Sequence, residues 1–114
     1  MGLNELDDAD FPAYTIGQAA DLLGVRQAFL RSLDTADLVR PHRSEAGHRR
    51  YSRRQLELVQ RVRALFDQGH SLAATTRILE LEDTLAAARA EIADLRDQLD
   101  AARPDEPASG GPVG

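Results

Sequence analysis

Three stretches decide the fold of this chain: YTIGQAADLLG (14–24), VRQAFLRSLD (25–34) and LVRPHRSEAGHRRYS (38–52). The first two carry apolar residues at helical spacing, and the third is a basic run built around a turn. A helix, a tight turn, a second helix and a basic hairpin follow one another. This order predicts a mainly α-helical, winged helix-turn-helix domain.

Two short helices are predicted at the start of this region. Thr15 followed by Gln18 fits a capping box, so the first helix should run from Ile16 to Leu23 and stop at Gly24. One apolar face is expected to hold Ile16, Ala19, Ala20, Leu22 and Leu23. The second helix, from about Arg26 to Thr35, should bury Phe29, Leu30 and Leu33. Arg26, Gln27 and Arg31 then lie on or near its other face, where its first turn leads into a major groove.

The basic run predicts a hairpin, with strands at 38–43 and 48–51 and Gly47 in the turn at positive φ. Pro41 restricts its strand to an edge. Six potential cations fall within eleven residues, offset only by Glu45: Arg40, His42, Arg43, His48, Arg49 and Arg50. Because such a concentration of one sign repels itself, we expect it to contact nucleic acid. The ring of Tyr51 should anchor the hairpin in the core, and its hydroxyl is a candidate phosphate contact.

A third helix should begin at Ser52, because Ser52 and Gln55 repeat the capping-box pattern. Its inward residues are expected to be Leu56, Val59, Val62, Leu65 and Phe66, and Gly69 should end it. Ser71 is placed to cap a fourth helix.

From Ile78 onward, apolar residues recur at spacings of three and four, which predicts a coiled coil of four heptads. Its a positions are Ile78, Leu85, Ile92 and Leu99, and its d positions are Leu81, Ala88, Leu95 and Ala102. A parallel dimer would set each alanine against itself, whereas an antiparallel register sets Ile92 against Ala88. We therefore favour an antiparallel homodimer. The alternative is a helix folded back onto its own domain.

Charge is divided sharply along the chain. The net charge is −5, yet residues 14–78 carry eleven arginines against six acids, while residues 1–13 carry four acids and residues 79–114 carry nine acids against three arginines. Local charge governs binding more than the total does. The middle of the chain therefore remains a candidate for binding double-stranded DNA. All fourteen basic residues are arginine, a bias that base composition of the genome also explains.

Several classes of function are excluded by what the sequence lacks. It has no cysteine, and His42, His48 and His70 show no metal-ligand spacing, so we expect no metal or other cofactor. Acids, bases and nucleophiles do not converge in a catalytic pattern, which predicts that the protein is not an enzyme. The start of the chain fits no signal peptide and no apolar run is long enough to span a membrane, so we expect the cytoplasm.

The predicted organisation has four parts. Residues 1–13 form a flexible acidic lead-in, 14–78 the winged helix-turn-helix domain, 79–103 the dimerisation helix and 104–114 a disordered tail. The residues expected to bind DNA are Thr15, Arg26, Gln27, Arg31, Arg40, Arg43, His48, Arg49, Arg50 and Tyr51. Those expected to form the dimer are Ile78, Leu81, Leu85, Ala88, Ile92, Leu95 and Leu99.

The segments YTIGQAADLLGV and FLRSLDTADLVRPHRSEAGHRRYSRRQLELV resemble the MerR-type transcription regulators, in which an IGEAA-like helix, an LRYYE-like helix and a GYRRYS-like wing recur in this order. GHRRYS is the most specific match, and the resemblance covers about residues 14–80. The later SLAATTRILELE is similar to the heat-shock repressor HspR branch.

The resemblance implies a winged helix-turn-helix domain and an antiparallel coiled-coil homodimer on near-palindromic promoter DNA. Arg31 takes the position of the family's helix-two arginine, and Arg49, Arg50 and Tyr51 take those of its wing. Ser32 and Leu33 stand where the family usually has aromatic residues, which implies an altered half-site. Many relatives carry a metal-binding or drug-binding region after the dimerisation helix. Here a short tail follows, so we expect regulation by abundance or by a protein partner.

Two other functions stay open. An excisionase-like DNA-architectural factor would share the winged fold without controlling a promoter. A protein-interaction adaptor would use its coiled coil to bind a different chain, and its basic domain would be incidental.

Overall fold

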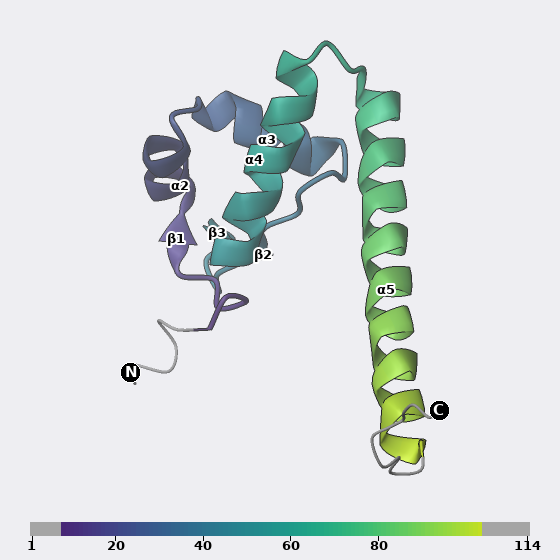
Figure 1. The fold of residues 1–114 in the computed structure, drawn as a ribbon. Coiled ribbons are helices and arrows are strands. Elements are labelled where there is room, and N and C mark those ends of the chain that lie inside the picture. Colours follow the sequence, from purple (N-terminus) through teal and green to yellow (C-terminus); the bar gives the residue numbers. More distant parts are fainter. Residues whose placement is uncertain (1–7, 104–114) are drawn as a thin grey trace, which may run out of the picture. The chain divides into compact units, whose positions relative to one another are not determined.

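The computed structural model describes residues 8–103. Its elements in chain order are β1 (Tyr14–Thr15), α2 (Ile16–Leu23), α3 (Gln27–Thr35), β2 (His42–Arg43), β3 (Arg49–Tyr51), α4 (Arg53–Asp67) and α5 (Leu72–Ala102), as Figure 1 shows. The chain divides into two compact units, Met1–Thr76 and Arg77–Gly114, and α5 crosses the boundary between them. The expected tail at 104–114 and the first seven residues of the expected lead-in lie outside the described residues.

The helices begin where their capping residues predicted. Before α2, the Gln18 backbone N–H donates to the Thr15 hydroxyl (3.1 Å), and the Gln18 side chain accepts from the Thr15 N–H (2.9 Å). Ser52 and Gln55 form the same box before α4, with the same two distances. Each box satisfies two backbone groups that a helix start leaves unpaired. The prediction of both starts is confirmed.

The sheet has three strands in the order β1-β3-β2, all antiparallel. Tyr14 pairs with Tyr51, and Arg43 pairs with Arg49. The hairpin and the positive φ of Gly47 (84°) were predicted, whereas β1 was not. The strands are also shorter than expected, because residues 36–39 form turns and bends that bond back to the end of α3. In this turn Asp37 adopts φ 60° and the Leu38 N–H donates back to the Leu33 carbonyl.

The core of the first unit lies between the helices and β3. Its buried apolar side chains are Ala19, Ala20, Leu30, Leu33, Val39, Tyr51, Leu56, Val59 and Val62. Most of these were predicted, but Leu22 is 64% exposed and does not belong to the buried face of α2. A helix of eight residues buries only a narrow stripe, here around Ala19 and Ala20, and Leu22 lies well round the helix from its centre.

Residues 8–13, part of the expected flexible lead-in, make specific contacts with the start of α4. The Arg54 backbone N–H donates to the Ala9 carbonyl at 3.0 Å. The Arg54 guanidinium also lies 2.6 Å from Asp10, and this exposed pair raises the pKa of Arg54. These contacts attach residues 8–13 to the domain.

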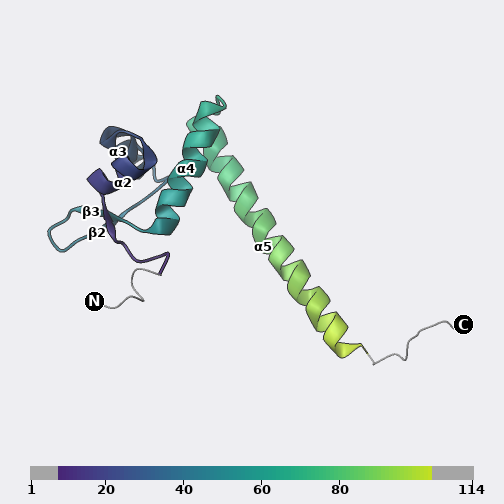
Figure 2. The ribbon, with the colours of Figure 1, turned by 60° about the vertical axis from the view of Figure 1, so that its left-hand side comes forward.

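One helix, α5, begins seven residues before the dimerisation helix was expected to start. Gly69, two residues after the end of α4, adopts a positive φ of 92° and separates the two helices. The Ser71 hydroxyl accepts a hydrogen bond from the Ala74 N–H at 3.1 Å, as its predicted capping role requires. Figure 2 shows α5 as a single unbroken helix. The coiled-coil pattern and the turns that precede it therefore belong to one continuous element.

Candidate nucleic-acid interface

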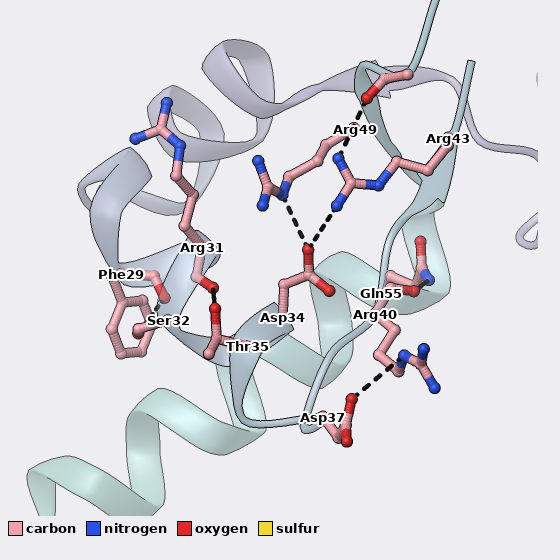
Figure 3. Close-up of polar contacts among 11 residues, drawn as sticks. Phe29, Arg31, Ser32, Asp34, Thr35, Asp37, Arg40, Arg43, Arg49 and Gln55 are labelled. Atoms are coloured by element: carbon pink, nitrogen blue, oxygen red, sulfur yellow. Dashed lines mark hydrogen bonds and ion pairs between the residues drawn. The ribbon is translucent and has the colours of Figure 1, made fainter. Parts of the chain in front are cut away.

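The exposed face of α3 carries the residues predicted to reach DNA bases. Arg26 is the N-cap residue and has extended backbone angles, and its side chain makes no capping bond. Gln27 and Arg31 are one helical turn apart, so they share a face, and Arg31 Nη2 donates to Gln27 Oε1 at 3.1 Å. Figure 3 shows the Arg31 guanidinium projecting outward from the helix. An arginine fork and an amide therefore stand together on an exposed helix face.

The rest of α3 uses its small polar side chains internally. The Ser32 hydroxyl donates to the Phe29 carbonyl (2.6 Å), and the Thr35 hydroxyl donates to the Arg31 carbonyl (3.1 Å). The Phe29 ring packs edge-on against Phe66 of α4, with centroids 6.1 Å apart. One side of α3 is thereby fixed to α4, which leaves the other side for a ligand.

Two of the predicted hairpin arginines converge on one carboxylate. Arg49 Nε lies 3.0 Å from Asp34 Oδ2, and Arg43 Nη2 lies 3.1 Å from the same oxygen (Figure 3). Asp34 belongs to α3 and was not singled out in the sequence, where it resembles any acid in a surface helix. Two signals were available: Asp34 takes the final, acidic position of the LRYYE-like motif, and it lies one turn after Leu30, on the side where α3 meets the hairpin.

Arg50 lies on the opposite side of the hairpin from this cluster. Successive strand residues point to opposite faces, so Arg50 and its cross-strand neighbour His42 face away from Arg49 and Arg43. Among residues 8–103, the Arg50 guanidinium has no hydrogen-bonding or ion-pair partner. The side chain of His48, beside the turn, is exposed. These hairpin cations are available to an external ligand.

Arg40 remains accessible although it has a partner. Its Nε lies 3.4 Å from Asp37, and both side chains are 74% exposed. Pairs this exposed contribute little, so DNA phosphate can replace Asp37 at small cost. The Arg40 carbonyl accepts a 2.6 Å bond from the Gln55 side chain, which also caps α4. Gln55 therefore fixes the loop that carries Arg40, a second role that the sequence did not reveal.

Two residues predicted to bind DNA, Thr15 and Tyr51, have structural roles within the domain instead. Thr15 accepts the capping bond of α2 and pairs with Arg50 across the sheet. Tyr51 is fully buried, and its hydroxyl has no hydrogen-bonding partner among the described residues. The ring is thus the predicted core anchor, while the hydroxyl reaches no surface in this conformation.

The charges around Tyr51 identify the centre of the basic cluster. Burial raises the pKa of Tyr51, the positive charges of Arg49, Arg43 and Arg31 oppose that rise, and Asp34 adds to it. The charges of three arginines and one acid therefore act on this hydroxyl, and the positive charges outnumber the negative one. The cluster joins α3 to the hairpin in one positive field.

The second unit presents an apolar stripe along α5. Leu81, Leu85, Ile92, Leu95 and Leu99 are each between 47% and 62% exposed. Ala88 is exposed as well, and Ile78 is half-buried. A row of large apolar side chains at heptad spacing is typical of a helix that binds another helix.

Two other kinds of feature are absent from the described part of the chain. Within residues 8–103, no group of three or more His, Asp or Glu side chains is arranged to hold a metal ion. None of the helices described is both long enough and apolar enough to cross a membrane.

Comparisons with known proteins place these features in context. The family model described as MerR HTH family regulatory protein matches residues 14–82. A Streptomyces coelicolor protein named heat shock protein HspR is 43% identical over 94 residues, which are 82% of this chain and 62% of that protein. The chain therefore spans less than two thirds of that relative's length.

Two solved structures resemble the fold. One is the crystal structure of HiNmlR, a MerR family regulator lacking the sensor domain, bound to promoter DNA. It is 26% identical, with a TM-score of 0.56 over 76% of this chain and 78% of that chain. The other is a MerR family transcriptional regulator from Bacillus cereus, 24% identical, with a TM-score of 0.55 over 77% of this chain and 78% of that one. The second likeness concerns the fold alone.

Proposed function

Because the chain belongs to the MerR HTH family of regulatory proteins, we propose that it regulates transcription by binding promoter DNA through α3 and the β2–β3 hairpin. The observation that carries this proposal is the positive charge gathered where α3 meets the hairpin: Arg43 and Arg49 meet at Asp34, and the exposed Arg31 lies on the same helix, with Gln27 one turn before it. HiNmlR, which shares the fold, was solved bound to promoter DNA. The family resemblance seen in GHRRYS and its flanking helices is confirmed by the match over residues 14–82.

In this proposal α3 enters the major groove with its N-terminal turn leading. Gln27 and Arg31 then reach base edges, since an amide pairs with adenine and a guanidinium fork with guanine. Arg26 lies at the start of the helix, where phosphate is favoured by the helix dipole. Recognition of the DNA base sequence therefore depends on α3.

The hairpin acts as a wing that binds the phosphate backbone. Arg50 supplies a guanidinium that has no partner among residues 8–103, and Arg40 and His48 add exposed groups. Arg43 and Arg49 contribute positive field, but their guanidinium groups are already directed at Asp34. Thr15 and Tyr51 support the wing through the sheet and the core, so we assign them no DNA contact.

We further propose that residues 14–78 form the winged helix-turn-helix domain and that residues 79–103 pair with a second copy as an antiparallel coiled coil. The support is the exposed stripe of α5, whose five large apolar side chains otherwise face water. A two-fold dimer carries two copies of α3, so its natural target is a near-palindromic site with two half-sites. Doubling the basic surface also raises affinity.

Genome-wide mapping of bound sites tests this function directly. We expect sites concentrated upstream of transcription units, each with an inverted repeat whose half-sites are about one helical turn apart or a multiple of it. Sites clustered at attachment or recombination loci would instead identify the excisionase-like alternative. If the wild-type protein occupied no reproducible genomic sites, both the promoter-binding proposal and the excisionase-like alternative would be contradicted.

A further inference from the structure

A single carboxylate joins α3 to both strands of the hairpin. The Asp34 oxygen that accepts from Arg49 at 3.0 Å also accepts from Arg43 at 3.1 Å (Figure 3). These two arginines are cross-strand partners, so one carboxylate oxygen binds β2 and β3 at paired positions of the hairpin. The side chains of Asp34 and Arg49 are only 16% and 25% exposed. Shielding from water makes this link stronger than the surface pairs elsewhere in the chain.

The guanidinium of Arg43 extends the link to the tip of the hairpin. While its Nη2 bonds Asp34, its Nη1 donates to the Gly47 carbonyl at 3.2 Å. The turn itself is closed by two backbone bonds of 2.8 Å, from Gly47 N–H to the Ser44 carbonyl and from Ser44 N–H to the His48 carbonyl. A continuous chain of polar contacts therefore runs from α3 to the turn.

The base of the hairpin is fixed by the pairing of β3 with β1 and by the buried ring of Tyr51, but its outer part and β2 have fewer contacts. Its strands have two and three residues, and β2 is an edge strand paired only with β3. Ribbons of this length are marginally stable in water. Without the carboxylate, the two guanidinium groups would face each other as like charges and repel. Asp34 therefore links the outer part of the hairpin to α3, in addition to the anchoring of β3 by β1 and the core.

We propose that Asp34 is a positioning residue, which holds the hairpin against α3 so that both elements present their cations at a fixed spacing. The benefit for DNA binding rests on the proposed function, whereas the bridge itself does not. Charge alone gives the opposite expectation, because removing an acid strengthens attraction to phosphate. Loss of position weakens operator binding, because the hairpin must then be ordered as the complex forms.

The test compares Asp34→Asn with the matched variant Asp37→Asn in the full chain. Both remove one negative charge from the same region, but Asp37 forms only an exposed pair with Arg40, and its φ of 60° suits asparagine. Amide hydrogen exchange at Ser44 and Gly47 reports the hairpin without DNA. Titrations with an operator duplex and with a random duplex report binding.

We expect Asp34→Asn to accelerate exchange at both amides at least fivefold and to weaken operator binding at least fivefold, while random-duplex binding is unchanged or tighter. Asp37→Asn should neither accelerate exchange nor weaken operator binding. Asp34→Glu keeps the carboxylate and should retain part of the wild-type protection from exchange and part of the wild-type affinity. Unchanged exchange in Asp34→Asn, or operator binding tighter than that of Asp37→Asn, would overturn the proposal. Should Asp34→Asn not fold, Arg43→Gln removes one arm of the bridge and must accelerate Gly47 exchange, or the proposal fails.

The two measurements, hydrogen exchange without DNA and duplex titration, separate this inference from the proposed function on which it builds. If the wild-type chain bound no duplex, the proposed function would fail. The exchange measurement would still decide whether Asp34 holds the hairpin.

Discussion

At the scale of single residues, Tyr51 has the structural role that the sequence predicts but not the position of a DNA contact. The sequence predicts for it both a ring in the core and a hydroxyl that contacts phosphate. In the structure its side chain is fully buried and the hydroxyl has no partner among the described residues. The adjacent Arg50, in contrast, has no hydrogen-bonding or ion-pair partner in the part of the chain that the structure describes. Pattern alone did not separate these two roles, because neighbouring strand residues alternate between faces and the register was not known.

We predict that Tyr51→Phe leaves DNA affinity unchanged. At neutral pH its free energy of unfolding should be equal to that of the wild type or higher by about 1 kcal/mol, because no hydrogen bond is lost and a buried unpaired hydroxyl is removed. Urea unfolding and duplex titration measure the two quantities. Affinity that falls severalfold without loss of stability would restore the hydroxyl as a DNA contact.

The same hydroxyl predicts a loss of stability in alkali. Burial raises the folded-state pKa of Tyr51 above the value of about 10 expected for the unfolded chain. The unfolded chain then releases its proton first, so this contribution is complete below about pH 10 and is lost as pH rises through the folded-state pKa. Urea unfolding across this range should show a smaller decline for Tyr51→Phe. Tyr14→Phe is the matched control, because Tyr14 pairs with Tyr51 but is only half-buried.

At the scale of elements, local signals were predictable and long-range contacts were not. Thr15 and Ser52 set the starts of α2 and α4 through side-chain bonds to residues three positions along, which a sequence pattern records directly. In contrast, β1 has two residues, and its partner β3 lies more than thirty positions away. The bridge from Asp34 to Arg49 spans fifteen positions and has no local pattern either.

The apolar stripe of α5 carries the next prediction. Leu85→Glu places a charge at the predicted dimer seam and should convert the dimer into a 12.5 kDa monomer at micromolar concentration. Ala90→Glu adds the same charge opposite the seam and should leave the mass unchanged. Sedimentation equilibrium measures both variants. A wild-type chain that is already monomeric, or a Leu85→Glu variant that stays dimeric, would refute the proposed dimer helix.

At the scale of the whole molecule, charge is divided along the chain between a basic middle at residues 14–78 and acidic stretches before and after it. Residues 14–78 hold eleven arginines against six acids. That excess was visible in the sequence, but its distribution was not. The structure directs Arg43 and Arg49 toward Asp34, joins Arg40 weakly to Asp37 and leaves Arg50 unpaired among the described residues. Arginines that look equivalent in the sequence therefore divide into those held by a carboxylate of the domain and those that we propose bind DNA.

The central claim, that α3 and the hairpin together bind a DNA duplex, is tested most directly by fluorescence-anisotropy titration of the full chain against fragmented genomic duplex over a series of salt concentrations. We expect a saturable complex whose log association constant falls linearly with log salt, by about 0.9 for each phosphate contacted. Arg50→Ala should reduce the magnitude of that slope by about 1, and Arg103→Ala, an exposed substitution beyond the end of α5, should not change it. Absence of any complex at low ionic strength would contradict the claim.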